Sequence, residues 1–240
     1  SDTRIVAGKF QKATRGLVAQ AIKTASDAGR FWREFGWQQR VAYLRKAAEL
    51  IAGHQHELAA LISLEVGKCR FDAFAEVNEA IQTMLYYCQQ TERHHGFAYR
   101  MNGATEELNQ CTLRPHGVWA LVTSFNFPFS IPAGSAVAAL VGGNTVVFKP
   151  SSRASLVGVR FTALLHDAGL PVGVFNLITG PGSEAIEELV THPGINGFAF
   201  TGTTKVGLTV LRQFAGACPR PCLAAMSGNA LADGRRGGHD

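Results

Sequence analysis

Residues 118–149 read VWALVTSFNFPFSIPAGSAVAALVGGNTVVFK, and this stretch decides the fold class. Two short runs rich in β-branched and aromatic residues, Val118–Val122 and Thr145–Phe148, flank a small and apolar segment, Pro132–Leu140. This pattern predicts a strand, a buried helix and a second strand. Two parallel strands need such a crossover connection, so the stretch predicts the basic unit of a parallel sheet.

The same alternation of strand and helix patterns continues toward the end of the chain. It predicts strands at Val174–Ile178, Gly197–Thr201 and Cys222–Met226, and helices at Ser155–Ala168, Ser183–Thr191 and Thr204–Phe214. Strands that alternate with single helices form a doubly wound parallel sheet, which binds ligands at the carboxyl ends of its strands. We therefore expect a Rossmann-like α/β fold in residues 116–230, with its chemistry at those ends.

The first hundred residues predict helices. Apolar residues recur at helical spacing in two stripes, Leu44, Ala47, Ala48, Ile51, Leu58, Leu61 and Ile62 in one and Phe74, Val77, Ile81, Met84, Leu85 and Cys88 in the other. Gly67 is expected to break the helix between them. We expect these helices to form the N-terminal helical part, residues 1–96, of the domain that contains the sheet.

Residues 97–115 alternate around Asn102-Gly103 and predict a hairpin arm. So short a hairpin is not stable alone, so it should pack on something, such as a partner subunit of a homo-oligomer. The last ten residues, 231–240, are rich in Gly, Arg and Asp and predict a disordered tail.

Composition excludes several classes of protein. The chain has 240 residues, 46% of them apolar, which is enough for a real core and excludes a disordered or collagen-like chain. Neither a bilayer-spanning run nor a signal-peptide core is expected, so we predict a cytoplasmic protein without a membrane partner. The net charge of +5 is too mild to predict a nucleic-acid partner. Five cysteines without regular spacing predict free thiols and no metal site.

Four predicted strand ends carry residues suited to chemistry. Asn126 can donate its amide to an oxyanion, or it can satisfy turn backbone. Lys149 needs an anion or polar partner such as a ribose or phosphate, unless it snorkels to solvent. Gly180-Pro-Gly182 supplies only the first part of a dinucleotide fingerprint. Thr203 opens a helix whose N-terminus can hold a pyrophosphate, or it is an ordinary N-cap.

Together these segments resemble the aldehyde dehydrogenase superfamily. The matching segments are Pro115–Trp119, Phe125–Pro128, Gly143–Ser151, Gly169–Asn176 and Phe200–Gly207, with Trp32, Arg40 and Glu65-x-Gly-Lys68 upstream. The resemblance covers roughly residues 15–230. The form of Phe125–Pro128 is similar to some semialdehyde and pyrroline-carboxylate dehydrogenases. In this family a cysteine attacks the aldehyde, hydride passes to NAD(P)+, and a Glu-activated water releases the acid.

The resemblance also implies roles for single residues. Asn126 matches the asparagine that stabilises the oxyanion, Lys149 the lysine that binds the adenosine ribose, Thr203 a pyrophosphate contact and Val206 an apolar contact under the adenine. The implied site for NAD or NADP consists of Thr123, Phe125, Lys149, Pro150, Ser151, Ser152, Gly182, Thr201, Gly202, Thr203 and Val206.

Ser152 bears on the choice between NAD and NADP. Many NAD-using members of the family carry Glu at this position, where it binds the ribose hydroxyls. Ser152 removes a charge that would repel a 2′-phosphate, and Arg153 is adjacent, so NADP should be tolerated. The alternative is that Ser152 only caps the next helix.

Two departures from the family pattern concern catalysis. Ala225 stands where the family's general-base motif has Glu, and a methyl group cannot accept a proton. The family's nucleophilic cysteine would lie beyond residue 240. We therefore expect a fragment of an NAD(P)-dependent dehydrogenase for an aldehyde or semialdehyde that lacks both groups. The alternatives are a catalytically dead dinucleotide-binding module and an assembly subunit held through its arm.

Overall fold

A computed structural model describes residues 6, 8–103, 107–217 and 219–227 and shows the predicted α/β fold. The strands of its main sheet are β3 (Val118–Val122), β4 (Thr145–Lys149), β5 (Phe175–Leu177), β6 (Gly197–Thr203) and β7 (Cys222–Ser227). They are all parallel, in the order β5-β4-β3-β6-β7. The connections run outward in opposite directions from the β3–β6 pair, which is the switch point of the sheet. The tail predicted at 231–240 lies outside the described residues.

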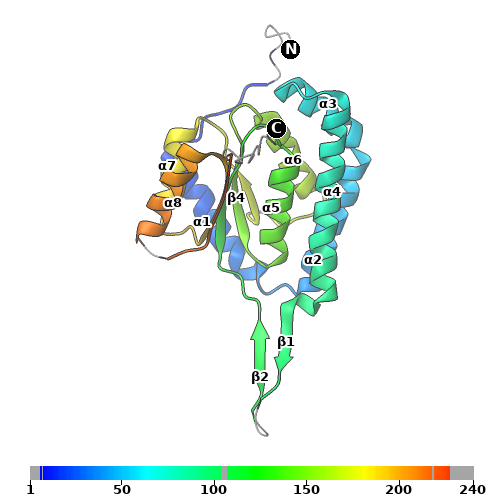
Figure 1. The fold of residues 1–240 in the computed structure, drawn as a ribbon, viewed down its shortest axis with the longest axis vertical. Coiled ribbons are helices and arrows are strands. Elements are labelled where there is room, and N and C mark those ends of the chain that lie inside the picture. The colour runs from blue at the N-terminus through cyan, green and yellow to red at the C-terminus, as the bar shows by residue number, and fades with distance from the viewer. Residues whose placement is uncertain (1–5, 7, 104–106, 218, 228–240) are drawn as a thin grey trace, which may run out of the picture.

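Helices cover both faces of this sheet. The four crossover helices are α5 (Ser130–Val141), α6 (Ser155–Asp167), α7 (Gly182–Thr191) and α8 (Thr204–Ala217). Figure 1 shows α5 and α6 on one side of the sheet, with α7, α8 and α1 (Arg15–Trp32) on the other. Side chains alternate along β3, so that Leu121 joins the core under α5, while Val118, Ala120 and Val122 join the core under α1 and α7.

The N-terminal helices pack on α5 and α6 and share their core. They are α2 (Trp37–Gly53), α3 (Gln55–Val66) and α4 (Arg70–Arg93). The predicted break at Gly67 is confirmed, because this residue ends α3 with a φ of 77°, which favours glycine. A second break at His54, between α2 and α3, was not predicted, although Gly53 ends α2 directly before it.

Some element boundaries differ from the predicted ones. Strand β6 runs to Thr203 rather than Thr201, because it stays paired with β7 as far as Thr203 opposite Ser227. Helix α5 starts at Ser130, two residues earlier than predicted, and so takes Pro132 into its first turn, where its missing N–H costs no helical hydrogen bond. Strand β5 is two residues shorter than predicted, although the two residues that flank it still bond to β4. Val174 O accepts from Val146 N, and Ile178 N donates to Phe148 O.

The predicted hairpin arm is confirmed as β1 (Ala98–Met101) and β2 (Asn109–Thr112), which pair antiparallel after a short 3-10 turn, η1 (His95–Phe97). All eight strand residues are exposed. The arm projects from the end of the molecule at which β3 begins, and therefore away from the carboxyl ends of the sheet (Figure 1). In the part of the chain that the structure describes, no helix is long and apolar enough to cross a membrane.

Candidate functional site

The carboxyl ends of β3 and β4 bring Thr123 and Lys149 together. Thr123 N donates to Lys149 O at 3.3 Å, and both side chains are buried. Lys149 is only 3% exposed, so it does not snorkel to solvent. Its amine donates to Pro150 O at 3.0 Å, and burial lowers the pKa of Lys149. An amine in this setting suits a polar ligand that supplies further acceptors.

The loop between β3 and α5, residues 123–129, is called the Asn126 loop from here on. Phe125, Asn126 and Phe127 are all exposed at its tip. Ser124 Oγ donates to Asn126 Oδ1 at 2.5 Å, so the Asn126 amide hydrogens remain to be offered to a ligand. Within the described residues Asn126 makes no hydrogen bond to turn backbone, which removes the ordinary structural explanation for this residue.

Two cations lie over the rings that flank Asn126. The Arg153 guanidinium carbon is 5.1 Å from the centre of the Phe125 ring, and Lys68 Nζ is 3.8 Å from the centre of the Phe127 ring. Both separations are within cation–π range. Lys68 is also paired with the carboxylate of Glu76, so Arg153 is the one of these two cations whose charge no described carboxylate neutralises, and it favours an anionic ligand beside the loop.

Carboxylates from the N-terminal helices occupy the N-termini of α5 and α6. Glu76 Oε1 accepts from Phe129 N at 2.8 Å and Ser130 N at 3.1 Å, where α5 begins. Glu65 accepts from Leu156 N at 2.7 Å and Val157 N at 2.8 Å, in the first turn of α6.

These carboxylates satisfy N–H groups that would otherwise bind an anion. Burial raises the pKa of Glu65, and its bonds from backbone N–H groups oppose that rise. These N–H groups in the first turns of α5 and α6 are therefore already bonded to carboxylates of the protein itself.

The other two crossover helices differ in their first turns. Helix α7 carries Glu184 there, whereas α8 has no acidic residue in its own first turn. Thr203 ends β6, and Thr203 and Val206 are both exposed beside the start of α8. Gly182 begins α7, which packs beside α8. Helices α5, α6 and α8 all lack an acidic residue in their own first turns, but at α5 and α6 a carboxylate from another helix takes that place.

The loop after β4 carries the remaining predicted residues. Pro150 is buried, Ser151 is half-buried and Ser152 is exposed. Helix α6 has Ala154, not Ser152, at its N-cap, and Ser151 Oγ accepts from Arg153 N at 3.3 Å. The interpretation of Ser152 as a helix cap is therefore wrong, and its side chain faces solvent next to Arg153.

Ala225 lies on β7 opposite Thr201 of β6. Both residues line a cavity of about 480 Å³, together with Trp119, Ser130 and Ser135. No carboxylate stands at this position of β7, although Glu79 of α4 reaches another wall of the cavity. Ala225 itself cannot accept a proton.

The cysteines that the structure describes do not supply an obvious nucleophile. Cys88 is fully buried in α4, and burial raises its pKa to about 11. Burial also raises the pKa of Cys222, which begins β7 and so lies away from the carboxyl ends of the sheet. Cys111 lies in the arm, and Cys69 caps α4. Cys218 lies outside the described residues, and the described part of the chain holds no cluster of three metal-ligating side chains.

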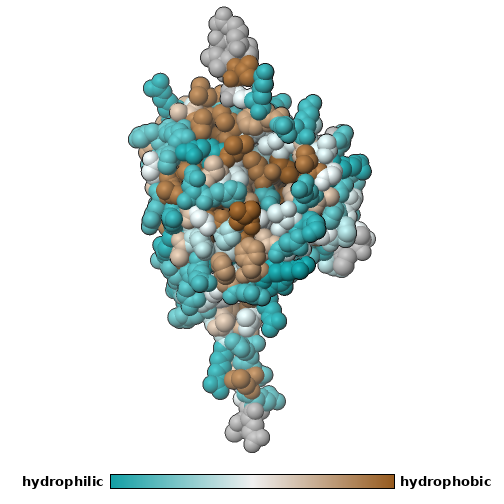
Figure 2. All heavy atoms as spheres, turned by 180° about the vertical axis from the view of Figure 1, so that it is seen from behind, coloured by the Kyte–Doolittle hydropathy of each residue, from teal (hydrophilic) through white to brown (hydrophobic). Residues whose placement is uncertain are grey.

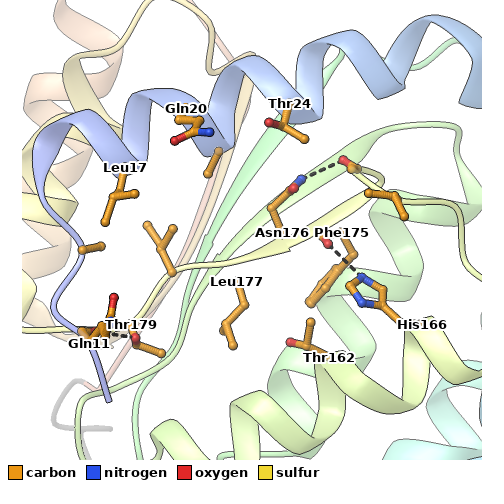
Figure 3. Close-up of a pocket in the computed structure, with 15 residues that line it drawn as sticks. Gln11, Leu17, Gln20, Thr24, Thr162, His166, Phe175, Asn176, Leu177 and Thr179 are labelled. Carbon is orange, nitrogen blue, oxygen red and sulfur yellow. Dashed lines mark hydrogen bonds between the residues drawn. The ribbon is translucent and has the colours of Figure 1, made fainter.

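A second groove of about 480 Å³ lies between α1, β5 and α6. Figure 3 shows Leu17, Gln20 and Thr24 of α1 facing β5, with Thr162 and His166 of α6 on the opposite wall. None of the site residues predicted from the sequence lines it. The predicted residues therefore gather at the carboxyl ends of the sheet and not in this groove.

Sequence reasoning missed the contribution of Glu76 to the site. The only signal in the sequence was the segment Glu65-x-Gly-Lys68, which matched the family without an assigned role. Glu76 contacts Phe129, Lys68 contacts Phe127, and Glu65 contacts Leu156, and each of these contacts joins residues more than fifty positions apart. Lys68 and Glu76, which also bond to each other, are close in the sequence.

Comparisons with known proteins identify the family. The model of the aldehyde dehydrogenase family matches residues 2–232. The chain is 37% identical over 210 residues to 1-pyrroline-5-carboxylate dehydrogenase of Anoxybacillus flavithermus, covering 88% of this chain and 41% of that protein. The namesake from Geobacillus thermodenitrificans is 38% identical over the same shares of both chains.

Solved structures give the same result. Proline utilization A from Bdellovibrio bacteriovorus superimposes with a TM-score of 0.90 and 33% identity, over 94% of this chain and 24% of that one. The NAD-dependent aldehyde dehydrogenase from Sinorhizobium meliloti gives 0.85 and 31%, over 90% of this chain and 43% of that one. This chain spans less than half the length of each of these proteins, and it belongs to the aldehyde dehydrogenase family.

Proposed function

We propose that these residues form the cofactor-binding part of an NAD(P)-dependent aldehyde dehydrogenase, which oxidises an aldehyde or semialdehyde to the acid. One observation carries the proposal. The β3–β6 switch point gathers the Asn126 loop, Lys149 and the start of α8 at one edge of the sheet. Ligands of doubly wound sheets bind at this place. The bound cofactor would supply the acceptor for the substrate's hydride.

The charges at the helix ends support a particular placement of the cofactor. Glu76 and Glu65 fill the N-termini of α5 and α6, so a pyrophosphate would meet a carboxylate at either helix. The first turn of α8 contains no acidic residue of its own, and Thr203 is exposed beside it. We therefore assign the pyrophosphate to the start of α8, near Gly202 and Thr203, and the adenine to the exposed side chain of Val206.

The adenosine ribose is assigned to the loop after β4. The buried Lys149 amine already bonds to Pro150 O, and a ribose hydroxyl would add an acceptor for one of its remaining hydrogens. Thr123 and Phe125 form the neighbouring wall. Ser152 and Arg153 are both exposed on this loop, so a 2′-phosphate would meet a cation and no carboxylate from either residue. We therefore propose that the site accepts NADP+ as well as NAD+.

The substrate class follows from the Asn126 loop and the relatives. The Asn126 amide hydrogens would stabilise an oxyanion formed from an aldehyde. Two relatives of this chain are named 1-pyrroline-5-carboxylate dehydrogenase, which supports a small semialdehyde as substrate. Since Ala225 offers no base and no described cysteine lies on the Asn126 loop, we propose that these 240 residues alone bind cofactor without oxidising aldehydes. Aldehyde-dependent turnover of NAD(P)+ by this polypeptide would contradict that proposal.

The exposed arm supports a homo-oligomer. Strand β1 presents the exposed side chains of Tyr99 and Met101, and the exposed Leu108 and Leu113 flank strand β2. Apolar side chains on a projecting hairpin are typical of a surface that another chain covers. We propose that a second copy of this chain packs on the arm.

Calorimetric titration with NAD+, NADP+ and ADP-ribose tests the proposed function. Lys149→Ala removes a charge-assisted hydrogen bond of about 1.5–3 kcal/mol, so it should weaken binding of all three ligands by roughly tenfold or more. Lys46→Ala is the matched control, because it removes an exposed lysine of α2 far from the site. Equal affinities for wild type and Lys149→Ala would refute the assigned site.

A further inference from the structure

Glu76 is a buried carboxylate with both oxygens in use. The residue is 2% exposed. Its Oε1 accepts from Phe129 N and Ser130 N, and its Oε2 accepts from Lys68 Nζ at 2.5 Å. A buried carboxylate is costly unless it is paired and hydrogen-bonded, and this one has both kinds of partner. The position of Glu76 therefore fixes the backbone at the end of the Asn126 loop.

Lys68 links this carboxylate to the tip of the same loop. Its Nζ lies 3.8 Å from the centre of the Phe127 ring while it donates to Glu76. The amine is confined to one place by two partners, a carboxylate and an aromatic face. Phe127 follows Asn126 directly, so the Lys68 contact acts on the tip of the loop and the Glu76 contact acts on its end.

The two contacts hold the loop from the side of α4. Helix α5 lies beside the longer helix α4 (Figure 1). The buried ring of Phe129, which packs edge-on against Phe161, gives the loop a third fixed point. On the loop itself, Asn126 makes one hydrogen bond to a described residue, from Ser124. The direction of its amide hydrogens therefore depends on how the loop is held.

We propose that Glu76 and Lys68 are positioning residues that aim the Asn126 amide at the oxyanion of the bound aldehyde. The proposal rests on the proposed function. Donors to an oxyanion must be held within about 0.5 Å of their productive place. Neither Glu76 nor Lys68 needs to touch the substrate, because both act through Phe127 and the backbone of residues 129 and 130.

The test compares isosteric variants by nuclear magnetic resonance, without ligand. Glu76→Gln keeps the shape but loses the charge, Lys68→Met removes the cation, and Lys68→Arg restores it. Glu92→Gln is the matched control. Glu92 lies on the same helix as Glu76 but at the far end from the loop, where it pairs with Arg45 of α2. The readouts are the side-chain amide resonances of Asn126 and the hydrogen exchange of the Phe129 and Ser130 amides.

We expect Glu76→Gln to speed exchange of these two amides about tenfold or more, because each loses a charged acceptor. Glu76→Gln and Lys68→Met should both shift the Asn126 resonances, Lys68→Arg should return them toward wild type, and Glu92→Gln should change neither readout.

Two outcomes would overturn the positioning role. One is unchanged Asn126 resonances in both Glu76→Gln and Lys68→Met. The other is an equal rise of exchange throughout α4 and α5, which would mean that the pair only stabilises the fold. A wild-type chain that binds no dinucleotide would instead contradict the proposed function, and the resonances would still decide whether the pair holds Asn126.

Discussion

Among single residues, Ser152 and Arg153 decide which cofactor the proposed site accepts. Both are exposed on the loop after β4, and Arg153 lies over Phe125 of the Asn126 loop. Within the described residues Arg153 has no acidic partner, so its charge remains available to a phosphate. The charge of Arg153 makes this loop positive, and the proposed binding of NADP+ depends on that positive charge.

Ser152→Glu should therefore weaken NADP+ binding roughly tenfold or more, because it places a negative charge beside the 2′-phosphate. NAD+ binding should be unchanged or tighter, since the new carboxylate can accept from the ribose hydroxyls. Ser26→Glu adds the same charge on exposed α1 and should affect neither ligand. Calorimetric titration gives both affinities, and an equal loss for the two cofactors would contradict the argument.

The reactivity of the Cys88 thiol tests whether the core between the N-terminal helices is closed to solvent. Burial raises its pKa from 9.0 to about 11, so its thiolate fraction at pH 8 should be about a hundredfold below that of an ordinary thiol. Iodoacetamide should label Cys88 far more slowly than the exposed Cys69 and Cys111, as read by mass spectrometry.

The same shift makes stability depend on pH with a definite sign. Between pH 9 and about pH 11 the unfolded chain loses the Cys88 proton while the folded chain keeps it, so this group lowers stability as pH rises. Cys88→Ala should lack that loss. Labelling of folded Cys88 as fast as Cys69 would show that this core is open.

The sequence predicted site residues where a strand ended in an unusual side chain. Asn126 and Lys149 could be found because a polar side chain at the end of an apolar strand needs a polar partner or a ligand. The structure removes the ordinary explanations for both residues, although their roles remain predictions. Glu76 could not be found in this way, because it lies on a helix and the backbone groups that it accepts from, Phe129 N and Ser130 N, lie more than fifty residues ahead.

Helices α5 and α6 are each held at the N-terminus by a carboxylate from another helix. For α6 the carboxylate is Glu65, the second-last residue of α3. Helix α5 is also held at its C-terminus, where Arg40 Nε donates to Val141 O at 2.9 Å and Trp32 Nε1 donates to Leu140 O at 3.1 Å. These contacts bind the N-terminal helices to the sheet as part of one structure.

Glu65→Gln should lower the free energy of unfolding by about 1.5–3 kcal/mol, because an amide cannot accept both Leu156 N and Val157 N as the carboxylate does. Glu92→Gln breaks a partly exposed ion pair with Arg45 and should cost about 0–1 kcal/mol. Urea unfolding at pH 7 measures both. Equal costs would contradict the role of Glu65 as the cap of α6.

Glu65 also predicts a pH dependence. Because burial raises its pKa above 4.5, the folded chain binds more protons than the unfolded chain just above that pH. The contribution of Glu65 to the free energy of unfolding therefore falls as pH rises through this window. In the Glu65→Gln variant, the free energy of unfolding should not show this fall.

Element types could be predicted more fully than element ends. The strand runs at 118–122 and 145–148 are short, apolar and bounded by turn residues, which fixes their type. The end of β6 at Thr203 depends on pairing with β7 and leaves no local signal, whereas the break at His54 follows Gly53, a signal that the helical spacing of the apolar residues on both sides obscured.

The whole molecule leaves apolar surface uncovered in several places. Apolar side chains spread across the middle of the face turned away in Figure 1, as Figure 2 shows. Leu223 of the edge strand β7 is 64% exposed, and both β5 and β7 are edge strands of the sheet. Exposed edges and apolar patches promote association.

We therefore expect the chain to associate in solution. Sedimentation velocity at micromolar concentration should show species larger than 25.7 kDa. A variant with Tyr99→Ser and Leu113→Ser in the arm region should shift the distribution toward monomer, while Val172→Ser, on the loop before β5, should not. A monodisperse wild-type monomer would contradict the proposed role of the arm.

Hydrogen exchange with and without ADP-ribose tests the central claim most directly, because it locates the ligand without assuming a site. The account predicts slower exchange in residues 149–153 and 201–207, at the carboxyl ends of β4 and β6. It predicts no change in residues 162–179, which line the groove between α1, β5 and α6. Protection in 162–179, with none at 149–153 or 201–207, would contradict the account.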